Sequence, residues 1–127
     1  MPETIVGDDF VPRRPDDAAE ILRGVGTSPG RRVGSVRVVR TLREGSALRD
    51  GEVLVLPASD VTWTPLFSRA IAVVTESGGM LAHASIVARE LGIPCVASAP
   101  GATRLTDGTR VRVDGFAGEV VVDPAGA

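Results

Sequence analysis

The sequence lacks several residue types, and each absence narrows what the chain can do. It contains no lysine, tyrosine, asparagine or glutamine, so all fourteen basic residues are arginine. Without lysine the chain has neither a Walker-type lysine for a nucleotide phosphate nor an amine that could form a Schiff base. We therefore expect that this chain by itself does not bind and cleave ATP.

Cysteine is almost absent as well. The single Cys95 excludes an internal disulfide. It lies in the apolar run IPCVAS, which indicates a small buried side chain on a strand and not an activated nucleophile. One cysteine and one histidine without metal-ligand spacing do not predict a zinc site, and no metal site is expected.

Charge and hydropathy exclude further classes of protein. The formal net charge of −2 argues against a nucleic-acid or membrane-surface binder. No apolar run approaches the roughly 18 residues that would span a bilayer. The first twenty residues are too acidic and too rich in proline for a signal peptide, so the expected location is cytoplasmic.

The length of 127 residues suits one domain with a sizeable core. Residues 1–22 are polar and interrupted by proline, and they predict a flexible N-terminal arm with one helical turn at most, in DDAAEILRG. Residues 23–127 are expected to form the folded domain.

Hydrophobic patterns in this domain predict an α/β fold. Short apolar strands are expected at 36–39, 51–57, 71–75 and 95–98. A short helix is expected from Pro65 to about Ala70, with Thr64 as its N-cap, and a longer helix at about 81–91 that Gly92 ends. The order strand, helix, strand predicts a parallel βαβ unit, and residues 107–123 read as an antiparallel hairpin.

His83 is the only histidine, and it follows the pair Gly78–Gly79 at the entrance of the longer helix. Glycine allows a ligand to approach the backbone closely, and the free N–H groups of a first helical turn favour an anion. Thr75 and Ser77 add hydroxyl donors nearby. An imidazole, whose unperturbed pKa is about 6.5, can attack a phosphoryl group and become a phosphohistidine. The alternative is a histidine that only caps or packs the helix.

The stretch TESGGMLAHASIVARELGIPCV favours the first interpretation, because it resembles the active loop of a known family. It is similar to the phosphohistidine, or swivelling, domain of phosphoenolpyruvate-utilising enzymes, such as phosphoenolpyruvate synthase, pyruvate phosphate dikinase and rifampicin phosphotransferase. The resemblance covers about residues 23–123, and WTPLF makes it most like the rifampicin-phosphotransferase and synthase members. The matching positions are Thr75, Gly78, Gly79, His83, Ala84, Ile86, Val87, Ala88 and Arg89.

The resemblance implies a three-layer β/β/α fold and a carrier function. His83 would take a phosphoryl group from ATP on a separate ATP-grasp domain or protein and deliver it to an acceptor, pyruvate or a small-molecule hydroxyl, held on another domain or protein. Thr75, Ser77, Gly78 and Gly79 would support the phosphate. No cofactor is expected on this chain alone, since ATP and Mg²⁺ would bind the partner.

The sequence departs from the family pattern at two positions. Leu81 stands where dikinases and synthases usually have a threonine that a regulatory kinase modifies, so we expect that control to be absent. Val61 replaces the usual proline after Asp60, which affects only the local turn.

Three further residues have structural interpretations. Arg89 lies about 240° around the helix from His83 and is read as structural or interfacial. Glu90 is read as a solvated charge, and Trp63 as a packing residue in preference to a docking surface.

Two hypotheses about function remain open at this stage. The chain is a phosphoryl carrier, or it is a degenerate swivelling domain that only docks partners. The initial Met1 and the leader favour a stand-alone carrier over a domain excised from a larger enzyme. The acceptor is not readable, since its binding residues belong to another domain.

Overall fold

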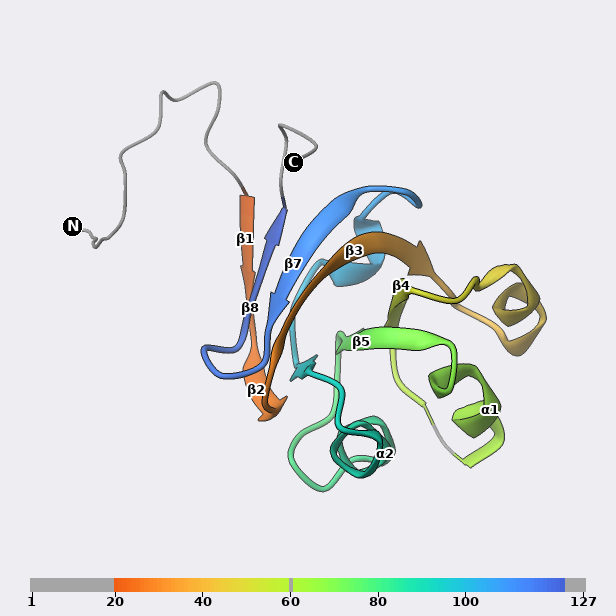
Figure 1. The fold of residues 1–127 in the computed structure, drawn as a ribbon, viewed down its shortest axis with the longest axis horizontal. Helices are drawn as coiled ribbons and strands as arrows, with labels where there is room; N and C mark the ends of the chain where they lie inside the picture. The colour runs from red at the N-terminus through yellow and green to blue at the C-terminus, as the bar shows by residue number, and fades with distance from the viewer. Residues whose placement is uncertain (1–19, 60, 123–127) are drawn as a thin grey trace.

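The computed structural model describes residues 20–59 and 61–122. Their strands join in the order β1-β8-β7-β3-β4-β5-β6-β2. Strand β3 (Arg31–Val38) connects an antiparallel half to a parallel half, because its first five residues pair with β7 and its last three with β4 (Figure 1). The expectations for residues 1–19 and 123–127 lie outside the described residues.

The parallel half contains the predicted βαβ unit. Strands β4 (Glu52–Leu56), β5 (Ala70–Thr75) and β6 (Cys95–Ala97) follow β3 in parallel. Helix α2 (His83–Leu91) connects β5 to β6, and Gly92 ends it in a left-handed conformation with φ of 74°. The strand–helix–strand prediction and the helix stop at Gly92 are therefore confirmed.

The antiparallel half contains the predicted hairpin. Strands β7 (Arg110–Asp114) and β8 (Glu119–Val122) pair with each other, and β1 (Glu20–Arg23) pairs with the free edge of β8. At the other end of the order, β2 (Val25–Ser28) pairs antiparallel with β6.

Two apolar clusters divide the molecule into three layers. One lies between the antiparallel strands and the parallel sheet and includes Val111, Val120 and Val53. The other lies between the parallel sheet and the helices and includes Leu54, Phe67 and Ala88. The alternation along β4 causes this division, since successive side chains of a strand point to opposite faces. The expected β/β/α arrangement is thus confirmed, with α1 and α2 together on the outer face of the parallel sheet (Figure 1).

Short helical turns fill the connections. They are the 3₁₀ helices η2 (Leu42–Ala47), η3 (Val61–Trp63) and η4 (Ala102–Arg104) and the single turn α1 (Thr64–Phe67). Among the described residues no helix is long and apolar enough to cross a membrane.

The prediction of a helical turn before residue 24 is wrong for the described residues. Residues 20–23 form β1, so the expected end of the arm at residue 22 falls inside a strand. The local sequence has no strand periodicity. Its conformation depends on the edge of β8, whose backbone groups take partners from β1 over Glu20↔Val122 to Arg23↔Glu119.

Helix α2 begins two residues later than predicted. Met80 and Leu81 belong to a turn that the Ala82 N–H closes by donating to the Gly79 carbonyl at 3.0 Å. His83 is therefore the first residue of the helix, with Ala82 as an N-cap that makes no side-chain hydrogen bond.

Candidate functional site

The loops that follow the parallel strands meet at one edge of the sheet. The residues after β4 lead to Ser59, the residues after β5 form the loop 76–82, and Ser98 follows β6. Parallel strands present their carboxyl ends together, which is where sheets of this kind bind ligands. His83 lies at this edge, at the entrance of α2.

Two hydroxyl groups hold the imidazole ring of His83. Ser59 Oγ lies 2.8 Å from Nδ1, and Thr64 Oγ1 lies 3.0 Å from Nε2. The bond at Nδ1 is partly buried, whereas the bond at Nε2 is exposed. The ring of Phe67 meets the imidazole edge-on, with centroids 5.7 Å apart and planes at 86°. The ring is thus oriented, and Nε2 is its accessible nitrogen.

Neither hydroxyl partner was predicted from the sequence. Thr64 was expected to be a helix N-cap, but it is the first residue of α1, Trp63 precedes it as the N-cap, and no side chain caps this turn. The Thr64 hydroxyl is used on His83, 19 residues away, which no local pattern can reveal. Ser59 carries no sequence signal, because only the chain path after β4 brings it to Nδ1.

The loop between β5 and α2 is fixed by bonds to its backbone. Gly78 has φ of +106°, a left-handed conformation that favours glycine. Ser77 donates both its N–H and its hydroxyl to the Pro57 carbonyl, each at 3.0 Å. The carbonyl oxygens of Gly78 and Met80 accept from Ser98 Oγ at 2.5 Å and from Arg89 Nη2 at 2.7 Å.

The same loop and the helix entrance leave a row of backbone amides without an acceptor. Six backbone N–H groups, three on each side of Ala82, have no acceptor on another residue within residues 20–59 and 61–122. Such amides, next to the positive end of a helix, attract an anion. They belong to Gly79, Met80, Leu81, His83, Ala84 and Ser85.

The residues expected to support a phosphate lie in different settings. Gly78 and Gly79 shape the loop that carries the free amides. Ser77 is exposed, with its hydroxyl committed to Pro57. Thr75 is 1% exposed at the end of β5, and its carbonyl accepts from the Ala99 N–H at 2.9 Å. Neither hydroxyl is a partner of the His83 ring, and a phosphate-supporting role for these four residues stays a prediction.

The structural interpretations of the neighbouring residues are confirmed. Arg89 joins α2 to its surroundings by donating to the Thr27 carbonyl at 2.8 Å and to the Met80 carbonyl. Glu90 is exposed, and Trp63 packs against the helix-side core. Cys95 is buried on β6, where burial raises the pKa of its thiol although hydroxyls of Thr27 and Ser85 oppose the shift.

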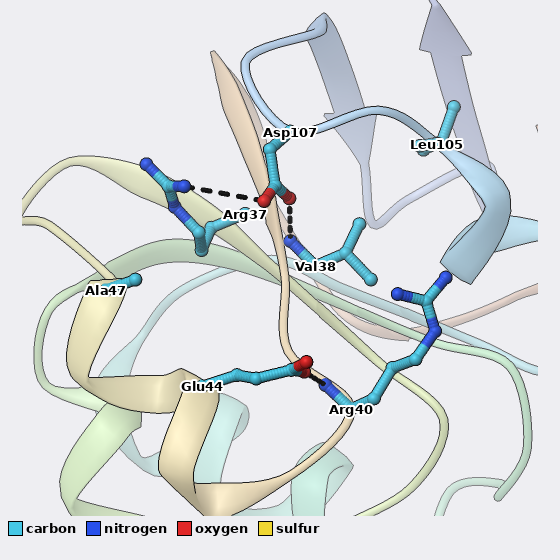
Figure 2. Close-up of a pocket in the computed structure, with 7 residues that line it drawn as sticks. All are labelled: Arg37, Val38, Arg40, Glu44, Ala47, Leu105 and Asp107. Atoms are coloured by element: carbon cyan, nitrogen blue, oxygen red, sulfur yellow. Dashed lines mark hydrogen bonds and ion pairs between the residues drawn. The ribbon is translucent and has the colours of Figure 1, made fainter.

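A separate pocket lies beyond the end of β3 and does not include His83 (Figure 2). Its volume is about 330 Å³. Its polar groups bind one another: Asp107 accepts from the Arg37 side chain at 3.4 Å and from the Val38 N–H at 2.7 Å, while Glu44 accepts from the Arg40 N–H at 2.6 Å. These polar groups already have hydrogen-bond partners, so nothing in this pocket points to chemistry. In the described part of the chain, no three metal-ligating side chains cluster.

Comparison with known proteins agrees with this geometry. A histidine at a helix entrance, on a three-layer β/β/α fold, fits a phosphohistidine domain. Residues 48–118 match the family described as PEP-utilising enzyme, mobile domain, and the chain belongs to this family.

Named relatives are much longer than this chain. It is 46% identical over 129 residues to an uncharacterized protein of Mycobacterium tuberculosis, covering 96% of this chain and 15% of that protein. It is 48% identical over 102 residues to the phosphoenolpyruvate synthase of Aeropyrum pernix, covering 79% of this chain and 12% of the synthase. The chain therefore corresponds to a small part of either relative.

A solved structure shares the fold. The solution structure of an Enzyme I protein superimposes with a TM-score of 0.54 and 29% sequence identity, covering 63% of this chain and 34% of that one.

Proposed function

We propose that this chain is a phosphoryl carrier in which Nε2 of His83 is transiently phosphorylated. The observation that carries the proposal is the geometry of the ring: Ser59 holds Nδ1 in a partly buried contact, and Nε2 lies at the exposed side, where the Thr64 hydroxyl binds it. Membership in the family of mobile domains supports it.

The hydroxyl partners accommodate the tautomer that this reaction needs. With the proton on Nδ1, that N–H donates to Ser59 Oγ, and the Nε2 lone pair accepts from the Thr64 hydroxyl. Nε2 is then the nucleophile once Thr64 releases it. The positive charge that the ring acquires on phosphorylation remains next to the Ser59 oxygen.

The surroundings suit the product of this reaction. A phosphoryl group on Nε2 carries negative charge, and the unpartnered amides between Gly79 and Ser85 supply donors and a helix dipole for it. Catalysis of phosphoryl transfer depends on positioning and on charge stabilisation, both of which such a loop provides.

The phosphoryl donor and acceptor belong to other proteins or domains. Membership in the family of mobile domains supports an arrangement in which ATP with its Mg²⁺ binds an ATP-grasp partner. The acceptor would be pyruvate or a small-molecule hydroxyl on a further partner, as the name of the Aeropyrum relative suggests for pyruvate. Leu81, which is 85% exposed, stands where relatives have a threonine that a kinase can modify. The proposed function therefore includes no regulation by a kinase at this position.

A small-molecule donor tests the proposal without the partner. With phosphoramidate, Nε2 forms a bond to phosphorus while the phosphorus–nitrogen bond of the donor breaks and ammonia leaves with its electron pair. Intact mass spectrometry should show a gain of about 80 Da that acid removes, as expected for one covalent phosphoryl adduct.

His83→Ala is the matched control and should show no gain. An adduct that persists in this variant, or no adduct on the wild-type protein, contradicts the carrier function. The second outcome would favour the competing hypothesis of a swivelling domain that only docks partners.

A further inference from the structure

Two side chains from outside the loop 76–82 bind its backbone carbonyls. Ser98, which follows β6, donates its hydroxyl to the Gly78 carbonyl at 2.5 Å. Arg89, on α2, donates Nη2 to the Met80 carbonyl at 2.7 Å, while its Nη1 holds the Thr27 carbonyl of β2 at 2.8 Å. The first and third residues of the segment Gly78–Met80 are thus each fixed at one oxygen atom.

Fixing a carbonyl also fixes the next amide. A trans peptide is planar, so its C=O and N–H bonds point in opposite directions, and the described residues contain no cis peptide. With the Gly78 oxygen on Ser98, the Gly79 N–H points away from that hydroxyl. With the Met80 oxygen on Arg89, the Leu81 N–H points away from the guanidinium.

These two amides belong to the row that has no acceptor within the described chain. Gly78 and Gly79 flank the first of these two peptide planes, so that plane could rotate by half a turn at small cost. A rotated plane would present a carbonyl oxygen, which repels a phosphoryl group, in place of an N–H. Ser98 opposes that rotation, and Arg89 fixes the plane between Met80 and Leu81.

Ser98 has a strained backbone conformation, which indicates that its side chain has a role. Its φ of +54° makes it the only non-glycine residue with positive φ in the described part of the chain. A residue with a Cβ is disfavoured there, and such strain gathers at sites where function requires it. Glycine would fit this backbone better, but it could not bind the Gly78 carbonyl.

We propose that Ser98 and Arg89 are positioning residues that hold the Gly78 and Met80 carbonyls so that the amides of Gly79 and Leu81 face a phosphoryl group on His83. Neither side chain touches the reacting atoms. The inference rests on the proposed carrier function, and it adds the device that keeps the anion-binding amides in place.

The decisive variant is Ser98→Gly, because it separates the two roles that a structural residue would combine. It relieves the strained φ and removes the hydrogen bond. We expect the melting temperature to stay the same or rise, while the rate of His83 phosphorylation by phosphoramidate falls about tenfold. A rate equal to that of the wild-type protein would overturn the role of Ser98.

Arg89 is tested with Arg89→Met and Arg89→Lys. Methionine keeps most of the aliphatic length and loses both hydrogen bonds, and lysine can restore one of them. The expected order of phosphorylation rates is wild type, then Arg89→Lys, then Arg89→Met. If Arg89→Met fails to fold, the Arg89→Lys rate together with Ser98→Gly decides the question, and wild-type rates in both overturn the proposal.

Amide chemical shifts provide a readout that stability does not move. In ¹H–¹⁵N spectra, phosphorylation of wild-type His83 should shift the amide protons of Gly79 and Leu81 downfield, as expected for hydrogen bonds to an anion. Ser98→Gly should abolish the shift at Gly79 and leave that at Leu81. If wild-type His83 accepts phosphate while both amides stay unshifted, the positioning role fails and the carrier function stands. If wild-type His83 accepts none, the carrier function itself fails.

Discussion

Thr64 and His83 are joined by a hydrogen bond of 3.0 Å between Oγ1 and Nε2. Thr64 opens the single turn α1, and His83 opens α2, so the two helix entrances face each other across this bond. A hydroxyl in this position lies within reach of oxygens on any phosphoryl group that Nε2 accepts. We therefore expect it to contribute to transfer as well as to orientation of the ring.

Thr64→Val should slow phosphorylation of His83 by about tenfold, since one hydroxyl donor near the developing charge is lost while the side chain keeps its shape. Thr64→Ser retains the hydroxyl and should keep most of the rate. The measurement is the rate of adduct formation with phosphoramidate, followed by intact mass. Equal rates for the valine and serine variants would show that the hydroxyl plays no part.

Glu76 links stability to pH at the same edge of the sheet. Its carboxylate accepts from Thr103 Oγ1 at 2.6 Å and from the Thr103 N–H at 2.8 Å. The hydroxyl and then the amide of Thr103 lower the pKa of Glu76. The resulting stabilisation is fully present above the unfolded-chain pKa of about 4.3 and is lost as the pH falls through the lower pKa of the folded protein.

Thr103→Val should therefore cost about 1 kcal/mol of unfolding free energy at neutral pH, the usual worth of a hydrogen bond. The difference from the wild-type protein should shrink well below the unfolded-chain pKa, because protonated Glu76 no longer gains from the hydroxyl. Urea titrations at several pH values measure both quantities. A difference that is independent of pH would disprove the linkage.

Gly115 allows the antiparallel hairpin to approach β2 closely. A Cβ on Gly115 would lie 1.8 Å from the Ser28 carbonyl oxygen, which is rigid backbone. Gly115→Ala should destabilise the protein by about 3 kcal/mol, as overpacking against a backbone group does. Gly79→Ala is the control, since a Cβ there meets nothing within 4 Å and should cost less than about 0.5 kcal/mol. Thermal unfolding distinguishes the two, and similar melting temperatures would contradict the close approach.

Cys95 should be unreactive in the folded protein. Burial raises the pKa of its thiol, and only the thiolate attacks disulfide reagents. We expect no reaction with Ellman's reagent at mildly alkaline pH and release of one thiol per chain after unfolding in urea. Rapid reaction of the native protein would show that the sheet opens at β6.

Much of this fold could be predicted from residue patterns, and the reasons are local. A continuous run of apolar residues defined β4, and Gly92 with Pro94 ended α2 where the structure ends it. The residues 20–23 could not be predicted, because four residues of mixed character become a strand only when the edge of β8 is available to pair with them. The prediction for Thr64 was wrong for a related reason: a threonine before a proline has the local signature of an N-cap, yet in the tertiary structure its hydroxyl binds His83.

The sequence by itself determined the family of the chain and singled out His83 as the candidate for the chemistry. A lone histidine after a glycine pair at a helix entrance can be recognised without the tertiary structure, because spacing along the chain already places it there. Only the tertiary structure decided how that histidine and the loop before it are held. Ser59, Thr64, Arg89 and Ser98 come from four different segments, and their hydrogen bonds depend on where the strands place those segments. Hydrogen bonds form only within about 3 Å, and such distances between segments are set by folding and not by sequence spacing.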